Sequence, residues 1–353
     1  MNGEPQKITL SAQSPRLALI GCERYLDSLP PERLLSHRYE ALFPPFGNRR
    51  ASVSRITPEQ MLPEAAAKAD GLVLGTAEWS TFPFVRKAIE MGLCVLNVTP
   101  LICAPNEWDY LSQLSAERRI TVAQAGLRHY NNRIQRIRQQ IKTGEFGTLR
   151  LVTCQAQFGI TPFDEVAGRT EPAANLISHI YDTLDVLLWW LGPIISISAD
   201  LHHQRKSQEI IYANLILRHQ RGPSLIRLTQ SMRVTEDKEH YEVEGSLKKE
   251  TIEYVRDDGW PPPFRNRRGI KKKTGANPPT DRQRPGESEF ERALDDFAGT
   301  IVGNGKSAMN RAAETHRVLQ TLQTTLISSR EKAKVTIPIK LPALSTGSIL
   351  TFP

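Results

Sequence analysis

Apolar and polar residues between positions 69 and 100 are arranged as strand, helix and strand. The run 71–75 is apolar and ends in glycine, which is typical of a strand buried on both faces. A second apolar run, 94–98, is stopped by the dipeptide 99–100. Between the two runs, apolar residues recur at the spacing of one helical face, at Phe82, Val85 and Ile89. The stretch therefore predicts a right-handed βαβ unit of a parallel sheet.

This unit also predicts where a ligand would bind, because parallel sheets bind ligands beyond the carboxyl ends of their strands. Those ends are expected at 76–80 and 97–100. An earlier apolar strand is expected at 16–20, and the turn that follows it belongs to the same predicted ligand site. Together these segments supply the candidate cofactor-binding residues, which are Gly21, Cys22, Glu23, Thr76, Asn97 and Pro100.

The turn after the first strand departs from the dinucleotide-binding pattern G-x-G-x-x-G. Only its first glycine, Gly21, is present, and Glu23 and Leu26 replace the other two. A carboxylate at a helix N-terminus is stabilised by the helix dipole and occupies the place of an anion. Glu23 is therefore expected to oppose a pyrophosphate.

The loop after the second expected strand, 40–43, bears on the choice between NAD and NADP. An NAD site expects an acidic residue there, and Arg49 and Arg50 follow instead. They are interpreted either as ligands of the NADP 2′-phosphate or as solvated loop arginines.

The pattern changes near 144–147, which divides the chain into two domains. Before it, helices at 104–119 and 131–142 and a strand at 121–124 continue an α/β, Rossmann-like domain over 16–147. After it, alternating β-rich runs surround a helix at 175–191, and they predict an α+β domain over 148–340. The runs are 149–158, 194–201, 209–218 and 224–233, followed by helices at 288–302 and 309–330 and a strand at 334–339. Tails are expected at 1–15 and 341–353.

Composition fits a globular protein of 353 residues with a formal net charge of +8. Much of that charge lies in an irregular, proline-rich loop at 259–286, interpreted as an anion-binding arm or as a solvated loop. The four cysteines are separate and lie in apolar contexts, which favours reduced thiols in a cytoplasmic protein and no metal site. The N-terminus lacks the apolar core of a signal peptide, and no run is long enough to cross a membrane.

Several segments in order resemble the Gfo/Idh/MocA family, named after glucose–fructose oxidoreductase and inositol dehydrogenase. They are the strand and turn at 16–21, AIEMGLCVLNVTP at 88–100, IKTGEFGTL at 141–149, HIYDTLDVLLWWLG at 179–192 and the segment 289–339. The resemblance covers residues 16–338. It implies an N-terminal domain that binds NAD or NADP and a C-terminal domain with an open, mostly antiparallel sheet. It also implies hydride transfer at a hydroxyl carbon of a sugar or cyclitol.

The family's catalytic lysine belongs to an E-K-P motif, whose positions here are Val98, Thr99 and Pro100. The lysine position is therefore Thr99, which can donate a hydrogen bond but carries no charge. The lysine would be a cationic donor to the reacting oxygen.

The family's D-x-x-x-H-x-x-D pattern can be placed on the helix by Asp185 and Gly192. This register puts Ser178 at the aspartate position and Asp182 at the histidine position, where the general acid/base would lie. His179 is one residue from the aspartate position at Ser178, and one residue on a helix is a rotation of about 100°. The catalytic candidates are thus Thr99, Ser178, Asp182 and His179.

The residues leave three functions open. One is a noncatalytic or repurposed member whose interdomain cleft binds a small ligand. Another is a divergent NAD(P)-dependent oxidoreductase with Asp182, His179 or His129 as its base, and a third is an anion-binding protein that uses 259–286. A homodimer is expected through one face of the second sheet, with Ile211, Leu215 and Leu217 as the proposed contact residues.

Overall fold

The computed structural model describes residues 15–22, 39–40, 58–75, 81–159, 176–203, 210–231, 234, 237–254, 288–303 and 312–337. Glu23, Thr76, the basic loop 259–286 and the tails at 1–14 and 341–353 lie outside these ranges. The interpretations that rest on them remain predictions.

The first sheet is parallel, with the strand order β2-β1-β3-β4-β5. Its apolar runs become strands because every residue of β1 and β3 is buried, as a sheet covered on both faces requires. The predicted Rossmann-like arrangement is therefore confirmed. The strands are β1 Leu17–Ile20, β2 Tyr39–Glu40, β3 Gly71–Leu74, β4 Cys94–Asn97 and β5 Val122–Gln124.

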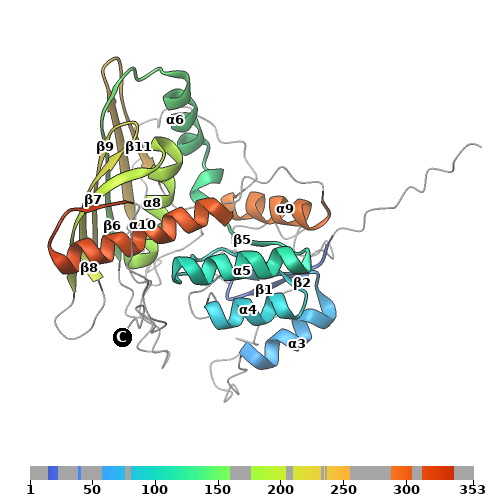
Figure 1. The fold of residues 1–353 in the computed structure, drawn as a ribbon. Coiled ribbons are helices and arrows are strands. Elements are labelled where there is room, and N and C mark those ends of the chain that lie inside the picture. The colour runs from blue at the N-terminus through green and yellow to red at the C-terminus, as the bar shows by residue number, and fades with distance from the viewer. Residues whose placement is uncertain are drawn as a thin grey trace, which may run out of the picture.

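Helices cover the two faces of this sheet from different parts of the chain (Figure 1). One face packs on α3 Pro58–Lys68, α4 Phe82–Glu90 and α5 Pro105–Arg118. The other face packs on α9 Glu289–Ile301, which comes after strands β6 to β11 of the second sheet in sequence. The approach of α9 is close, since a Cβ atom on Gly71 would lie 3.0 Å from the ring of Phe297.

The second sheet has seven strands in the order β11-β10-β6-β9-β8-β7-β12. Only β6 and β9 pair in parallel, so the predicted mostly antiparallel sheet of an α+β domain is confirmed. Strands β10 and β11 were not predicted from the sequence. The strands are β6 Leu149–Gly159, β7 Ile194–His203, β8 Ile210–His219, β9 Pro223–Ser231, β10 Lys238–Gly245, β11 Lys249–Tyr254 and β12 Val335–Thr336.

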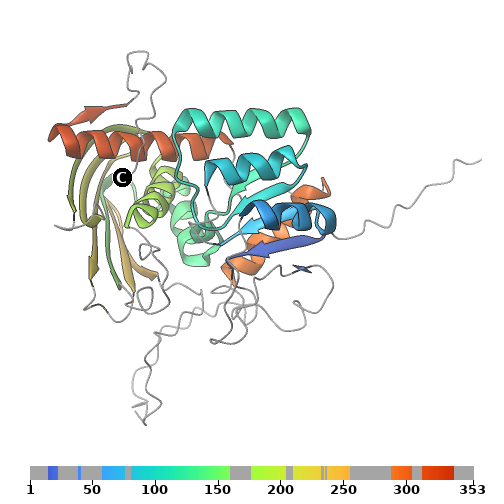
Figure 2. The same cartoon turned by 90° about the horizontal axis from the view of Figure 1, so that it is seen from below.

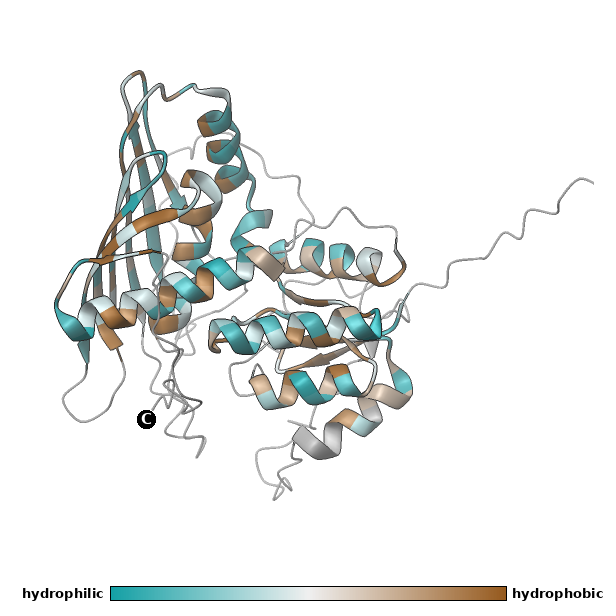
Figure 3. Cartoon of the chain, viewed as in Figure 1, coloured by the Kyte–Doolittle hydropathy of each residue, from teal (hydrophilic) through white to brown (hydrophobic). Residues whose placement is uncertain are grey.

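Two long helices connect the second sheet with the first domain. Helix α8, Leu176–Leu191, lies between the second sheet and the first domain and packs on β8 and β9 (Figure 2). Helix α10, Ala312–Glu331, contacts β7 and α8 and also reaches α5. Hydropathy colouring shows α4, α5 and α10 alternating apolar and polar residues, as expected for helices with one buried face (Figure 3).

The junction between the domains is a short 3₁₀ helix followed by a capped α-helix. The 3₁₀ helix η1, Leu127–Tyr130, follows β5 directly. The Asn131 side chain then accepts hydrogen bonds from two backbone N–H groups and caps α6, Asn132–Thr143. Gly144, with φ of 78°, ends that helix in the left-handed conformation that glycine favours.

The expected dimer residues on β8 prove to face the wrong way. Leu215 and Leu217 are fully buried in the chain's own core, and Ile211 is partly buried. Because side chains alternate along a strand, the opposite face of β8 carries Ile216, which is 57% exposed. The alternation of apolar residues along β8 was predicted correctly. The apolar residues, however, lie on the face that packs in the core and not on the uncovered face of the sheet.

Among the described helices, none combines the length and the apolar character that a bilayer crossing requires.

Candidate functional site

Polar side chains at the carboxyl ends of β4 and β5 are bonded to the protein's own backbone. The Thr99 hydroxyl donates to the carbonyl oxygen of Gly75 at 2.6 Å, and the Asn97 amide donates to Ala123 at 3.3 Å. The Gln124 side chain accepts from the N–H of Leu101 and donates to its carbonyl. Thr99, Asn97 and Gln124 are all buried, so these bonds hold the strand ends together.

The turn after β1 is packed against the end of β3. Gly21 has φ of 65°, which suits the first glycine of a dinucleotide-binding turn. A Cβ atom on Gly75 would lie 2.3 Å from the Gly21 carbonyl oxygen, so only glycine fits there. The thiol of Cys22 points inward, toward the carbonyl oxygens of Ile20 and Val73. The described part of the turn thus has the positive φ that glycine favours at its first position, and the next residue in sequence is Glu23.

The α8 candidates have different surroundings. The ring of His179 is 3% exposed and stacks on Phe158, with centroids 3.5 Å apart and planes at 10°. Ser178 is partly buried. The Asp182 side chain is 19% exposed, and its carboxylate lies 3.9 Å from Nη2 of Arg128. Thr99 thus bonds to β3, His179 packs on β6, and Asp182 faces η1.

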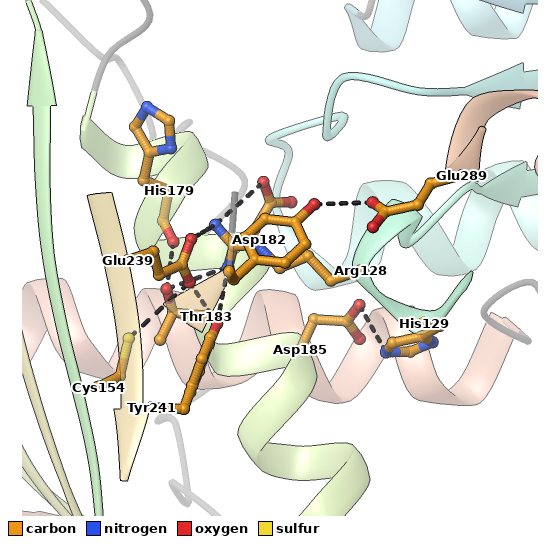
Figure 4. A network of polar contacts seen from close by, with 11 residues as sticks. Arg128, His129, Cys154, His179, Asp182, Thr183, Asp185, Glu239, Tyr241 and Glu289 are labelled. Carbon is orange, nitrogen blue, oxygen red and sulfur yellow. Dashed lines mark hydrogen bonds and ion pairs between the residues drawn. The ribbon is translucent and has the colours of Figure 1, made fainter. Parts of the chain in front are cut away.

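Arg128 is the centre of a buried polar network that sequence analysis missed (Figure 4). Its Nη2 atom lies 2.9 Å from Oε2 of Glu239 on β10. Its Nη1 atom donates to the hydroxyls of Thr183, at 3.2 Å, and Tyr241, at 3.4 Å. The Tyr241 hydroxyl in turn donates to Glu239. One guanidinium of the first domain is thereby held by α8 and β10 of the second.

Burial and charge fix the protonation states in this network. Burial by itself lowers the pKa of Arg128, but Glu239, Tyr241 and Asp182 outweigh it and raise the pKa above its usual value. Burial, reinforced by Glu239, raises the pKa of Tyr241. Burial and Glu239 also raise the pKa of the Cys154 thiol. Arg128 therefore stays cationic, and Cys154 is a neutral thiol rather than a nucleophile.

Three further polar contacts extend across the junction. Glu289, at the start of α9, accepts hydrogen bonds from the Tyr254 hydroxyl and the Asn131 amide, both at 2.8 Å. His129 Nε2 lies 3.1 Å from the carboxylate of Asp185 on α8. The His129 ring also stacks on Trp189, with centroids 4.2 Å apart. These contacts join η1 and α9 to α8 and β11.

One signal for the network was present in the sequence. Along β10, Glu239 alternates in phase with Tyr241 and Val243, which are both fully buried. A carboxylate on the apolar face of a strand needs a cationic partner. That signal was usable only after β10 had been recognised as a strand. Nothing local to Arg128 identified Glu239 as its partner, since more than a hundred residues separate the two in sequence.

Comparison with known proteins adds to this geometry. No protein-family model and no curated protein matches the sequence. Solved structures do match: WlbA dehydrogenase from Bordetella pertussis, solved with NADH and UDP-GlcNAcA, is 16% identical with a TM-score of 0.67. That alignment covers 93% of this chain and 100% of WlbA. The fold is that of the Gfo/Idh/MocA dehydrogenases.

Two other Gfo/Idh/MocA-type structures show the same likeness. GenD2 from gentamicin A biosynthesis, solved with NAD, is 14% identical with a TM-score of 0.68, over 96% of this chain and 100% of GenD2. Scyllo-inositol dehydrogenase from Lactobacillus casei, solved with NAD(H) and scyllo-inositol, is 11% identical with a TM-score of 0.62. It aligns over 92% of this chain and 99% of its own. At identities this low, the structural likeness shows the Gfo/Idh/MocA fold alone. The chemistry has to be argued from the residues of this chain.

Proposed function

We propose that this protein is a divergent Gfo/Idh/MocA member that binds a small ligand at the junction of its domains without the family's standard hydride transfer. The observation that carries the proposal is the bonding of Thr99, at the family's lysine position. Its hydroxyl donates to Gly75 of the neighbouring strand end at 2.6 Å.

The second catalytic position supports the same proposal. Hydride transfer between a hydroxyl carbon and a nicotinamide needs a group that moves the hydroxyl proton and a donor that stabilises the oxygen. Asp182 stands at the histidine position, and its carboxylate faces the buried cation Arg128. The neighbouring His179 ring is buried against Phe158. Neither arrangement resembles a base that is open to a substrate.

A nicotinamide dinucleotide, NAD or NADP, is the proposed cofactor-type ligand. The conformation of Gly21 supports this proposal, as do the structures of WlbA, GenD2 and scyllo-inositol dehydrogenase, which contain NAD or its reduced form. Gly21, Cys22 and Pro100 would border it, with Asn97 and Thr99 shaping the strand ends beneath. Bound dinucleotide would supply a hydride acceptor or donor. Glu23 is expected to weaken this binding by repelling the pyrophosphate.

The test is a fluorescence titration of the protein with NADH and NADPH, followed by turnover assays on sugars, cyclitols and sugar acids. We expect weak dinucleotide binding, tighter binding by Glu23→Gly, and no turnover. Thr99→Lys alone is expected not to restore turnover, because the base is still absent. Tight binding by the wild-type protein would contradict the role given to Glu23.

A divergent oxidoreductase is the second candidate, and the 3.1 Å contact between His129 and Asp185 favours it. A carboxylate that orients an imidazole is a common arrangement for a general base. Against it, the His129 side chain is 2% exposed and stacks on Trp189. Turnover that collapses in His129→Gln or Asp182→Asn, with dinucleotide binding retained, would establish this candidate and overturn the first.

Two further proposals concern partners. A homodimer through the uncovered face of the second sheet is proposed, now centred on Ile216. Anion binding by the loop 259–286 is the third function left open by the sequence. Retention on heparin that weakens with salt would support it, and passage without retention would contradict it.

A further inference from the structure

Helix α10 belongs to the second domain but is attached to the first domain at one of its ends. The Nε1 atom of Trp108, on α5, donates to the carbonyl of Ala312 at 2.9 Å. The next residue of α5, Asp109, has its Oδ1 atom 2.7 Å from Nδ1 of His316. Ala312 and His316 are one helical turn apart. These two contacts therefore hold the first turn of α10 against α5.

The other end of α10 is attached to the second sheet. The Ser328 Oγ atom accepts a hydrogen bond from the N–H of Ala199 at 3.0 Å, and Ser329 Oγ accepts one from the N–H of Leu201, also at 3.0 Å. Both amides belong to β7, and α10 packs along this strand. One helix thus connects α5 of the first domain with β7 of the second.

The stretch between these two attachments is expected to be stiff. Residues 312–331 contain no proline and no glycine, which are common causes of kinks in helices. Val318, Leu319 and Leu322 are buried in the core along the way. At 1.5 Å per residue, the 20 residues of α10 form a rod of about 30 Å.

The attachment of α10 to α5 lies away from the place where the chain crosses between the domains. In the described part of the chain, this crossing runs from η1 through α6 into β6. Helices α6 and α10 both contact α8, and they lie on opposite sides of it (Figures 1 and 2). Hinges form at loops and at the ends of elements, so η1 and α6 are where one domain would pivot on the other.

The two attachments differ in what a rotation of the domains would do to them. The Arg128 network belongs to η1, and contacts at a pivot move little when the bodies joined there rotate. The contacts of Ala312 and His316 lie on the other side of α8, where the same rotation would pull α10 off α5. A rotation that the pivot alone would permit is therefore opposed by α10.

We propose that α10 acts as a strut that locks the two domains at a fixed separation. The strut consists of residues 312–331, held by α5 at one end and by β7 at the other. It goes beyond the proposed function, because it concerns the motion of the domains and does not depend on which ligand binds. The junction that carries Thr99 and Asp182 keeps one width, and a ligand enters it without rotation of the domains.

The test measures the separation of the domains by pulsed electron spin resonance between two spin labels on the full-length protein. The labels are attached through Ala67→Cys on α3 and Leu247→Cys at the hairpin between β10 and β11, two exposed positions. The four native cysteines are buried, so the introduced thiols take the label. An excess of unlabelled protein removes distances between copies. With α10 unchanged, we expect a single narrow distribution of distances.

Gln320→Pro interrupts the strut near its middle, because proline removes a helical hydrogen bond and clashes with the carbonyl of His316. A kink of about 20° displaces the end of a half-helix by about 5 Å, so we expect the distribution to broaden and shift by about that distance. Arg86→Pro is the matched control. Arg86 is exposed on α4, which packs on α3, α5 and β4 of the first domain, and this variant is expected to keep the original distribution.

Two outcomes would overturn the strut. A broad or double distribution with α10 unchanged would show that the domains are not locked. A Gln320→Pro distribution equal to that of the unchanged protein would show that other contacts set the separation. Should Gln320→Pro fail to fold, Gln320→Gly/Gln323→Gly decides between the same outcomes, because glycine loosens a helix with a smaller loss of stability than proline causes. No ligand is added, so neither outcome bears on the proposed function.

Discussion

Arg128 shows how one residue of the first domain can depend on partners far along the chain. It neutralises Glu239 at 2.9 Å in surroundings that exclude water, with both side chains no more than 4% exposed. Removing one partner of such a pair destabilises the protein by more than the pair stabilises it, because the other charge is left buried and unpaired.

Replacing Arg128 with methionine is therefore expected to lower the free energy of unfolding by about 3–5 kcal/mol. Arg128→Met/Glu239→Gln removes the orphaned charge as well and is expected to recover part of that loss. Urea unfolding of the wild type, both single variants and the double variant measures the coupling. Additive losses in the double variant would show that the two charges do not interact.

His219 gives a pH dependence whose sign can be worked out. Its Nδ1 lies 3.0 Å from the carbonyl of Gly192, and its Nε2 lies 2.9 Å from the Ser224 hydroxyl. Burial lowers the pKa of His219 from 6.5 to about 4. The unfolded chain therefore takes up the proton first as pH falls. The contribution of neutral His219 is complete above pH 6.5 and is lost on the way down to pH 4.

The loss due to His219 over this range is expected to be about 3 kcal/mol. His219→Gln should be less stable at neutral pH and should lose less stability between pH 6.5 and 4. Urea unfolding at a series of pH values compares the two, with His240→Gln on the exposed face of β10 as the control. Equal slopes in wild type and His219→Gln would contradict the assignment.

At the scale of elements, the contact between the turn after β1 and the end of β3 requires a residue without a side chain, Gly75. Gly75→Ala places a Cβ atom 2.3 Å from the Gly21 carbonyl oxygen and 2.8 Å from the Cys22 Cα, so the backbone must move. We expect a loss of several kcal/mol, as for other substitutions that force strain on a packed core.

Gly92→Ala is the control, because its Cβ atom would meet nothing within 4 Å and only its φ of 85° opposes the change. That penalty is expected to be about 1 kcal/mol. Thermal unfolding of both variants measures the difference. A Gly75→Ala protein as stable as Gly92→Ala would mean that the turn is not tightly packed on β3.

The elements also show which kinds of pattern could be predicted from the sequence. Strands β1, β3 and β4 and helix α6 were foreseen within a few residues, because each carries its own apolar period and a capping residue or glycine. Strand β10 was missed because charged residues occupy its outer face and Glu239 interrupts its inner face. Thr99 and Asp182 were predicted as site positions, whereas their contacts with Gly75 and Arg128 depend on tertiary packing that no local pattern contains.

At the scale of the whole molecule, the uncovered face of the second sheet is the surface proposed for association between copies. Ile216 lies on that face next to Leu225 of β9, which is opposite it in the strand register. Ile216→Lys is therefore expected to convert the proposed homodimer to a monomer, because a lysine there would have to be buried unpaired.

Light scattering after size exclusion measures the change. Leu247→Lys is the control, since Leu247 is 78% exposed at the hairpin between β10 and β11 and lies away from the centre of the sheet. A wild-type monomer, or an Ile216→Lys protein that still dimerises, would contradict the proposed interface.

The placement of α9 has a consequence for how the protein folds during its synthesis. Its Phe290, Ala293 and Phe297 cover the face of the first sheet that Leu19, Val73 and Leu96 present. During synthesis, the first five strands leave the ribosome long before α9 does, and strands β6 to β11 of the second sheet are translated in between. One apolar face of the first sheet is therefore exposed to water, or covered by a chaperone, until α9 in the last quarter of the chain has been synthesised.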